Sequence, residues 1–248
     1  MNKQRFLNTY VSNITMNEAL DDIEKMIRSK KKSYVVAVNV DVIMKIEQDE
    51  ELKTITNEAD MVLTDGKPLI WISKLKKAPI KEKISGSDLV PKLCELSDKK
   101  GYTIFILGGK DGIAEQAKKK LESQYKNIRI VGVYSPKFGF ENDKKELTKI
   151  NSMINKKKPD LLFVCLGCPK QEKWIYNHIN EYDAKVSICA GATVDFLAGN
   201  MKRAPKWMSN CGLEWFYRFL QEPKRLFKRY FIDDIKILKL LRKYDDKK

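Results

Sequence analysis

The sequence predicts an α/β fold, a doubly wound, mainly parallel, Rossmann-like sheet followed by a C-terminal helical appendage. Short apolar runs rich in β-branched residues alternate with amphipathic helical patterns, and the runs are apolar at nearly every position. Such runs are typical of parallel strands that are covered on both faces. In residues 196–248 the composition changes to 14 Lys and Arg against 6 Asp and Glu. We therefore predict an α/β catalytic domain over residues 1–195 and a basic, aromatic-rich appendage over 196–248.

Six apolar runs are the predicted strands, at residues 34–38, 61–63, 102–107, 128–133, 161–166 and 185–189. Helical patterns fill the gaps between them. Thr15 and Glu18 form a capping box that opens a helix ending near Arg28. Further helices are predicted over residues 111–124, 141–156 and 170–180. This alternation of strand and helix is the pattern of a doubly wound sheet.

The appendage carries two apolar stripes with helical spacing on either side of Pro223. The first consists of Leu213, Phe216, Tyr217 and Leu220, and the second of Phe227, Tyr230, Phe231, Ile235, Leu238 and Leu241. Basic residues flank both stripes, as in helices that lie on an anionic membrane surface. The same pattern also fits a helix pair that packs on the domain with a solvated basic rim. The sequence leaves both interpretations open.

The net charge of +15 over 248 residues calls for a polyanionic partner: nucleic acid, an anionic membrane or a phosphorylated substrate. The single histidine, His178, excludes zinc sites with several histidines and disfavours a Ser-His-Asp hydrolase. No apolar run approaches the roughly 20 residues that span a bilayer. Five cysteines without a signal peptide favour free thiols in a reducing cytosol. We expect a cytoplasmic protein, peripheral on the inner face of the plasma membrane.

Ligands of open parallel sheets gather at the carboxyl ends of the strands. Asp65 directly follows a predicted strand and precedes Gly66, so its carboxylate suits a general base. An aspartate that merely caps its own turn fits the same pattern. Residues 107–112, Leu-Gly-Gly-Lys-Asp-Gly, run from a strand into a helix start, where Gly108, Gly109 and Lys110 can bind a diphosphate. An ordinary strand–helix turn is the alternative there.

Other candidate ligands follow the later strands. Gln171, shortly after Gly167, offers an amide suited to sugar hydroxyls or phosphate oxygens. Asp195 follows the last strand, and Arg203 belongs to a basic cluster that precedes the appendage. No DxD pair stands near a strand end to hold a divalent metal. We therefore expect no metal or other cofactor, and expect lysines, arginines and backbone N–H groups to meet the leaving-group charge.

Taken in order, eight motifs resemble the WecG/TagA/CpsF family of bacterial glycosyltransferases, glycosyltransferase family 26. They are Asn39, residues 64–66 (TDG), 85–89 (SGSDL), 107–110 (LGGK), 169–174 (PKQEKW), 195–199 (DFLAG), 202–207 (KRAPKW) and 212–215 (GLEW). The resemblance extends from about residue 5 to residue 240. Two departures from the family's usual pattern stand out. Where members often have Thr-x-Asn-Pro, this chain has Ala37-Val-Asn39-Val40, so any role of that threonine is lost or replaced. Lys83 stands where members often have arginine and keeps the charge without the bidentate geometry.

The resemblance implies an inverting, metal-independent transfer of N-acetylmannosamine from UDP-ManNAc to undecaprenyl-diphosphate-linked GlcNAc, as in teichoic acid linkage units. Another UDP-hexose donor, serving a capsule or exopolysaccharide, is the alternative within the family. The implied general base is Asp65, with Gln171, Arg218 and Arg225 as further catalytic residues. The implied substrate-binding residues are Asn39, Gly66, Lys83, Gly86, Asp88, Gly108, Gly109, Lys110, Gly167, Asp195 and Arg203.

The expected partners are the UDP-sugar donor, the polyprenyl-diphosphate-linked acceptor and an anionic membrane surface. A nucleic-acid-binding module is the rival explanation of the charge, but no recognition motif accompanies the basic residues, which are interleaved with an apolar stripe. The sequence leaves open the exact donor sugar, the pathway and the oligomeric state, a homo-oligomer included. It also leaves open whether the appendage arginines act in catalysis or only anchor the protein.

Overall fold

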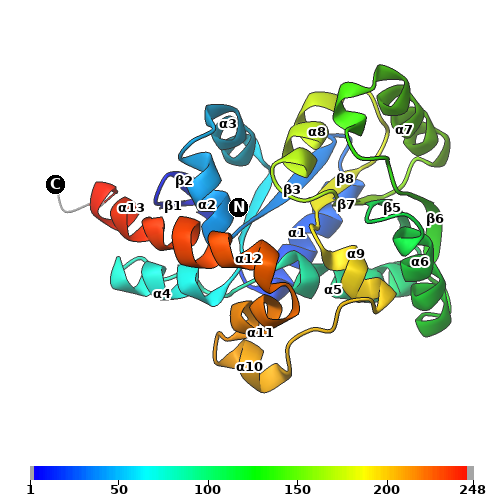
Figure 1. Cartoon of the computed structure of the whole chain (residues 1–248). Helices are drawn as coiled ribbons and strands as arrows, with labels where there is room; N and C mark the ends of the chain where they lie inside the picture. Colours follow the sequence, from blue (N-terminus) through cyan, green and yellow to red (C-terminus); the bar gives the residue numbers. More distant parts are fainter. Residues whose placement is uncertain (1–2, 245–248) are drawn as a thin grey trace.

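The fold is organised around a six-stranded parallel sheet (Figure 1). The structure is a computed structural model that describes residues 3–244. The strand order is β4-β3-β8-β7-β5-β6. The strands are β3 (Ser33–Val38), β4 (Met61–Thr64), β5 (Thr103–Gly108), β6 (Arg129–Tyr134), β7 (Leu161–Cys165) and β8 (Val186–Cys189). All six predicted strands are confirmed, with ends that differ from the prediction by no more than one residue.

Helices cover both faces of the sheet and enclose two apolar cores (Figure 1). One core receives side chains from α2 (Val40–Ile46), α3 (Glu50–Glu58), α4 (Lys67–Leu75), α7 (Lys144–Lys157) and α8 (Lys170–His178). The other receives side chains from α1 (Met16–Arg28), α5 (Gly86–Lys100), α6 (Ile113–Gln124) and α9 (Thr193–Ala198). The doubly wound prediction is thereby confirmed, and the capping box of Thr15 and Glu18 opens α1 as expected.

A short antiparallel hairpin at the N-terminus was not predicted. It consists of β1 (Lys3–Phe6) and β2 (Thr9–Ser12). Its turn places Leu7 at φ 52°, a conformation that usually calls for glycine or asparagine. Ser12 accepts a hydrogen bond of 3.1 Å from the backbone N–H of Val62, so β2 lies beside the edge strand β4. The hairpin covers an edge that would otherwise be exposed.

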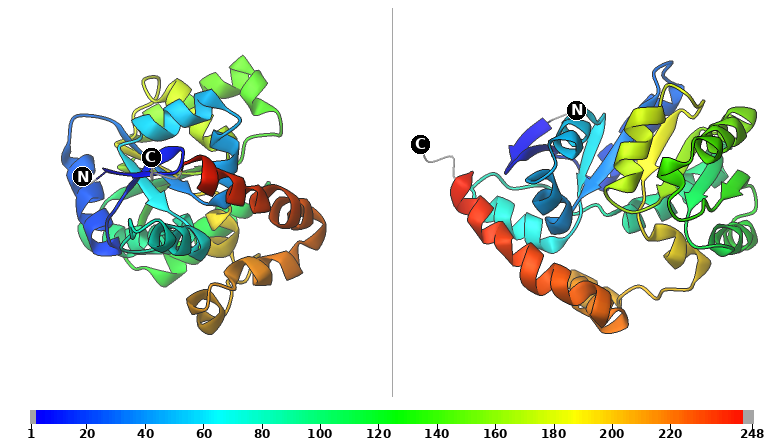
Figure 2. Two further views of the ribbon diagram at one scale, coloured as in Figure 1. Left: turned by 90° about the vertical axis from the view of Figure 1, so that its left-hand side faces the viewer. Right: turned by 45° about the horizontal axis from the view of Figure 1, so that its top comes forward.

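The appendage is a chain of short helices that lies across one end of the domain (Figure 2). It contains α10 (Lys206–Asn210), α11 (Glu214–Gln221), α12 (Pro223–Lys228) and α13 (Ile237–Lys243), with a π-turn and a 3₁₀ turn between the last two. Leu226, Ile237 and Leu240 are buried. The predicted boundary between residues 195 and 196 falls inside α9, and the boundary itself remains a prediction.

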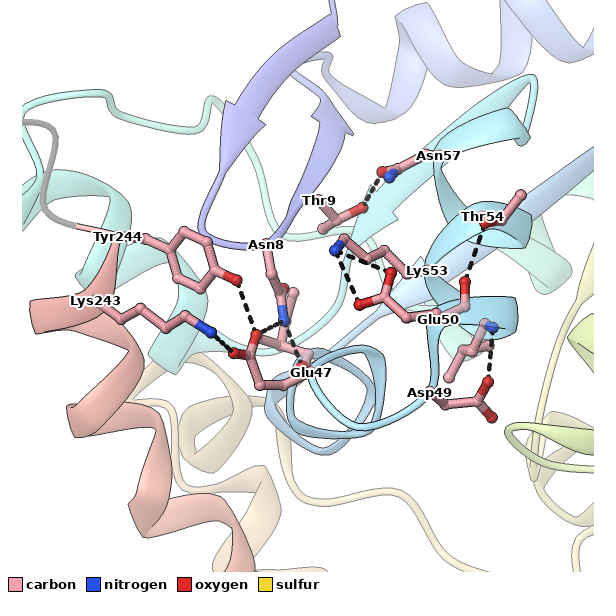
Figure 3. Close-up of polar contacts among 12 residues, drawn as sticks. Asn8, Thr9, Glu47, Asp49, Glu50, Lys53, Thr54, Asn57, Lys243 and Tyr244 are labelled. Atoms are coloured by element: carbon pink, nitrogen blue, oxygen red, sulfur yellow. Dashed lines mark hydrogen bonds and ion pairs between the residues drawn. The ribbon is translucent and has the colours of Figure 1, made fainter.

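Polar contacts at the end of α13 fasten the appendage to the domain (Figure 3). Glu47, after α2, accepts hydrogen bonds from Lys243, from the Tyr244 hydroxyl at 3.0 Å and from the Asn8 amide at 2.9 Å. Burial opposes ionisation of this carboxyl, but these bonds outweigh it and lower the pKa of Glu47. One carboxylate therefore joins the N-terminal hairpin, α2 and the last helix.

The apolar residues of the appendage divide between two faces. The face that packs on the domain uses Leu226, Ile237 and Leu240. Four members of the second predicted stripe are instead exposed: Phe227, Phe231, Ile235 and Leu238. The packing of a helix pair on the domain is therefore confirmed for one face of these helices, and membrane association of the exposed face stays a prediction. Within residues 3–244, no helix combines the length and apolarity that a membrane span requires.

Replacing Leu240 with alanine is expected to lower the free energy of unfolding by about 2–5 kcal/mol. Leu240 is 5% exposed and belongs to the core formed with α2 and α8, so truncation leaves a cavity. Urea unfolding followed by circular dichroism measures the change. Leu238→Ala is the matched control, because Leu238 is 60% exposed. Equal stability of the two variants would contradict docking of α13 on the domain.

Candidate functional site

The loops after β3, β4, β5, β7 and β8 meet at the carboxyl edge of the sheet, because all six strands are parallel. Close backbone packing holds them there. A Cβ atom on Gly86 would lie 3.2 Å from the carbonyl oxygen of Ala190, and one on Gly109 would lie 3.0 Å from Val194. The start of α5, the β5–α6 loop and the β8–α9 loop therefore pack directly against one another.

Both packing and backbone conformation require glycine at positions 108 and 109. Gly108 has φ 115°, and a Cβ atom there would lie 2.4 Å from the carbonyl oxygen of Cys165. The Gly109 N–H donates to that same carbonyl over 3.2 Å. This N–H group is consequently already bonded within the protein. Lys110 is exposed beside them, and its role as the cation of a diphosphate-binding loop remains a prediction.

Asp65 lies at the end of β4, where Gly66 (φ 100°) turns the chain into α4. Its backbone N–H donates to the Val38 carbonyl over 2.7 Å. The Asn39 amide at the end of β3 approaches the Asp65 carboxylate at 3.5 Å. Burial raises the pKa of Asp65, and the cations of Lys83 and Arg218 only partly oppose this. A carboxyl with a raised pKa and an amide neighbour suits proton abstraction.

An ionic cluster surrounds Asp65. Lys83 contacts Asp88 at 2.7 Å and Glu214 at 3.7 Å. Arg203 contacts the same two carboxylates at 2.6 and 3.7 Å. Although burial favours the neutral acid, these cations and Ser85 hold the pKa of Asp88 well below its usual range. The cluster joins the start of α5, the linker to the appendage and the first turn of α11.

Arg218, one turn after Glu214 on α11, faces the same region. Its guanidinium lies 5.8 Å from the ring centroid of Phe196 on α9, and its Nε has no hydrogen-bond partner among residues 3–244. In that range it also forms no ion pair within 4.0 Å. Arg218 acts electrostatically on Asp65. It is the cation best placed to meet a negative charge at the site.

Arg225 is positioned differently. Its guanidinium donates from Nε and Nη2 to the two carboxylate oxygens of Glu222, with Nε 3.0 Å from Oε1. Lys110 acts electrostatically on Glu222, and both members of this pair act electrostatically on Asp195. Burial raises the pKa of Asp195, and Lys110 opposes that rise. Arg225 is thus paired where Arg218 is not, although both were predicted as catalytic residues.

Gln171 joins two of the loops. Its side-chain oxygen accepts the backbone N–H of Gly191 over 3.0 Å, and its own backbone N–H donates to the Gly167 carbonyl over 3.0 Å. Apart from the adjacent residues in the chain, no atom of the described residues lies within 4 Å of where a Cβ would stand on Gly167 or Gly191. Both glycines therefore border open space at the carboxyl edge.

Two charged residues near the site were missed. Glu214 belongs to the ionic cluster described above, and it stands four residues before Arg218, a spacing that places both on one face of a helix and could have indicated it. Arg229 approaches Asn39 at 3.4 Å and Asp41 at 3.7 Å. No sequence pattern distinguishes Arg229 from its basic neighbours, because its position depends on how the appendage packs.

A cavity of about 440 Å³ adjoins the ionic cluster. Ser87 and Arg203 line it on the cluster side, while Phe196, Leu197 and Met201 provide an apolar wall. Within residues 3–244 we find no group of three or more His, Cys, Asp or Glu that could hold a metal ion. The edge of the sheet therefore presents a carboxyl group with a raised pKa, several cations and a partly apolar cavity.

Comparison with known proteins gives consistent matches. The model of the glycosyl transferase WecG/TagA/CpsF family matches residues 4–248. A protein of Bacillus subtilis (strain 168), named N-acetylglucosaminyldiphosphoundecaprenol N-acetyl-beta-D-mannosaminyltransferase, is 33% identical over 214 residues, which are 86% of this chain and 81% of that protein. Proteins with the same name from Bacillus spizizenii and Staphylococcus aureus (strain MRSA252) are 30% and 28% identical, covering 79% and 86% of this chain and 74% and 83% of their own lengths.

Proposed function

Because this chain belongs to the glycosyl transferase WecG/TagA/CpsF family, we propose that it transfers N-acetylmannosamine from UDP-ManNAc to undecaprenyl-diphosphate-linked GlcNAc. The enzyme is a glycosyltransferase, and the names of its relatives supply the sugar and the acceptor. The observation that carries the proposal is Asp65 at the carboxyl end of β4, between the Asn39 amide and the cations of Lys83 and Arg218.

The proposed reaction is a single inverting displacement. The acceptor hydroxyl oxygen bonds to the anomeric carbon while the bond from that carbon to the UDP oxygen breaks. Asp65 takes the hydroxyl proton, and the electron pair of the broken bond leaves on the diphosphate of UDP. Arg218 and Lys110 stabilise this negative charge. In this proposal cationic side chains supply the stabilisation, so EDTA should not lower the rate.

Purified enzyme incubated with a panel of UDP-sugars and a GlcNAc-diphosphate-lipid acceptor tests the function. Mass spectrometry should show an acceptor gain of one N-acetylhexosamine, largest with UDP-ManNAc. A preference for another UDP-hexose would change the donor that we propose, but the reaction would still be a glycosyl transfer. If none of the UDP-sugars supported transfer to the acceptor, the proposal would be overturned. A gel-shift titration at low salt tests the nucleic-acid alternative, for which we expect no binding.

We further propose that the exposed appendage face docks on the anionic inner surface of the plasma membrane. Phe227, Phe231, Ile235 and Leu238 are each between 41% and 60% exposed. Exposed basic side chains stand beside them: Lys224, Lys228, Lys239 and Arg242. Aromatic and aliphatic side chains next to cations are typical of helices in the interface of anionic lipids. Such docking would bring the site to a lipid-linked acceptor.

The double variant Phe227→Glu with Leu238→Glu is expected to weaken binding to phosphatidylglycerol vesicles at least tenfold. Each substitution removes a side chain whose burial contributes about 1.5–3 kcal/mol and adds a charge of the same sign as the lipid. Vesicle co-sedimentation measures binding. Phe138→Glu is the control, because Phe138 is 99% exposed in the loop before α7. Undiminished binding of the double variant would remove this face from membrane docking.

A further inference from the structure

Glu172 is the least exposed acidic residue near the site, with 0% of its surface accessible. It is the third residue of α8 and follows Gln171 directly. Its Oε1 accepts a hydrogen bond of 2.8 Å from the Gln171 side-chain amide. Its Oε2 has no hydrogen-bond partner among residues 3–244. Carboxylates are almost never fully buried unless they are paired, so this position requires an explanation.

The surroundings of Glu172 disfavour a charged carboxylate. The groups that act on it are the Gln171 amide, its own backbone N–H, the thiols of Cys168 and Cys189, and the cation of Lys45. The Lys45 ammonium binds Asp41 at 2.8 Å and the Cys168 carbonyl at 3.1 Å, so it is already paired. Burial raises the pKa of Glu172. Burial therefore favours the neutral form of this acid, and its Oε1 accepts the Gln171 amide.

This hydrogen bond fixes which way the Gln171 amide points. Its NH₂ group faces Glu172, so its oxygen faces the backbone N–H of Gly191. If the amide were reversed, its NH₂ group would face an N–H, and two donors would meet. The two side-chain hydrogen bonds of Gln171, with Glu172 and with Gly191, thus connect the buried core to the β8–α9 loop. That loop borders open space at the carboxyl edge.

We propose that Glu172 is a positioning residue for glycosyl transfer: it orients the Gln171 amide, which in turn holds the Gly191 backbone in place beside the substrates. The inference rests on the proposed function, because it assigns the loop to the substrate side of that reaction. This role requires an acceptor at Oε1, and the buried Glu172 provides it. It also gives Gln171 a role in shaping the site.

Two substitutions at Glu172 separate positioning from packing. Glu172→Gln keeps a neutral side chain with an oxygen acceptor, and we expect its kcat/KM to remain within about threefold of the native enzyme. Glu172→Leu keeps similar volume but removes the acceptor, and we expect kcat/KM to fall at least tenfold. Tyr182→Phe is the matched control. It removes a buried 2.9 Å hydrogen bond to Ser187, so it lowers stability without changing kcat/KM.

A double-variant cycle tests whether Glu172 acts through Gln171. In a Gln171→Ala background, Glu172→Leu should change kcat/KM by less than twofold. An undiminished tenfold loss in that background would overturn the proposal. So would native activity of Glu172→Leu, or equal damage in folded Glu172→Gln and Glu172→Leu. Urea unfolding of each variant identifies those that fold.

Hydrogen exchange of the Gly191 amide provides a readout that needs no substrate. Exchange should be slow in the native enzyme and in Glu172→Gln, and faster in Glu172→Leu and Gln171→Ala. If the native enzyme fails to transfer any sugar, the proposed function fails, while the exchange rates still report on the Glu172–Gln171–Gly191 contact. Unchanged exchange in Glu172→Leu would contradict that contact.

Discussion

Replacing Asp65 with asparagine is expected to lower kcat at least a hundredfold while leaving the fold intact. A positioned general base contributes about 10²–10⁴-fold, and asparagine has the shape of aspartate without its proton affinity. The raised pKa of Asp65, caused by burial, brings the carboxyl closer to the working pH than an ordinary aspartate. Initial rates with saturating donor and acceptor measure the loss, and urea unfolding checks the fold.

Asp41→Asn is the matched control for Asp65. Asp41 also follows a strand at the carboxyl edge, but its carboxylate binds Lys45 and lies 3.7 Å from Arg229. We expect this variant to lose much less activity. Turnover of Asp65→Asn close to that of the native enzyme would remove Asp65 from the role of base.

The pH dependence of kcat/KM should also report the titration of Asp65 as the base. A base acts when deprotonated, so activity is present above its pKa and falls as the pH decreases through it. Because burial raises the pKa of Asp65, the acid limb should lie above the ordinary value for aspartate, about 3.9. Measured rates from pH 4 to pH 8 locate this limb. A limb at the ordinary value would contradict a buried base.

The parallel sheet could be predicted because its strands are apolar at nearly every position. The N-terminal hairpin could not, because its turn uses Leu7 at φ 52° where glycine or asparagine would have given a signal. Pro91 lies inside α5, and no helix was assigned there from the sequence. Local sequence patterns therefore identified the buried strands, while the hairpin and α5 depend on tertiary contacts.

The candidate site was predictable as far as topology alone determines it. Residues that follow parallel strands must meet at one edge, which brings Asn39 and Asp65 together. The direction of each appendage side chain was not predictable, since it depends on how short helices pack. The stripe of Phe227, Phe231 and Leu238 is periodic yet exposed, whereas Leu226 is buried. Arg229 was missed for the same reason.

Replacing Arg218 with alanine is expected to lower kcat about 10²–10³-fold, the usual effect of removing one donor that stabilises transition-state charge. Arg218 has no ion-pair partner within residues 3–244 and acts electrostatically on Asp65. Its charge is consequently available to the departing diphosphate. Arg218→Lys should recover only part of the activity, because an ammonium lacks the planar pair of donors. Rates on a water-soluble acceptor analogue measure the effect without membrane binding.

Two other arginines of the appendage distinguish catalysis from anchoring. Arg225 is paired with Glu222, so Arg225→Ala should cost less than Arg218→Ala. Arg242 is exposed on α13, at the opposite end of the appendage from α11 (Figure 1), and Arg242→Ala should leave turnover of the soluble analogue unchanged. Point variants are preferable to deleting the appendage, because Ile237 and Leu240 belong to the core and their loss would unfold the domain. If all three variants turned over the soluble analogue at the native rate, the appendage would anchor the enzyme without entering its active site.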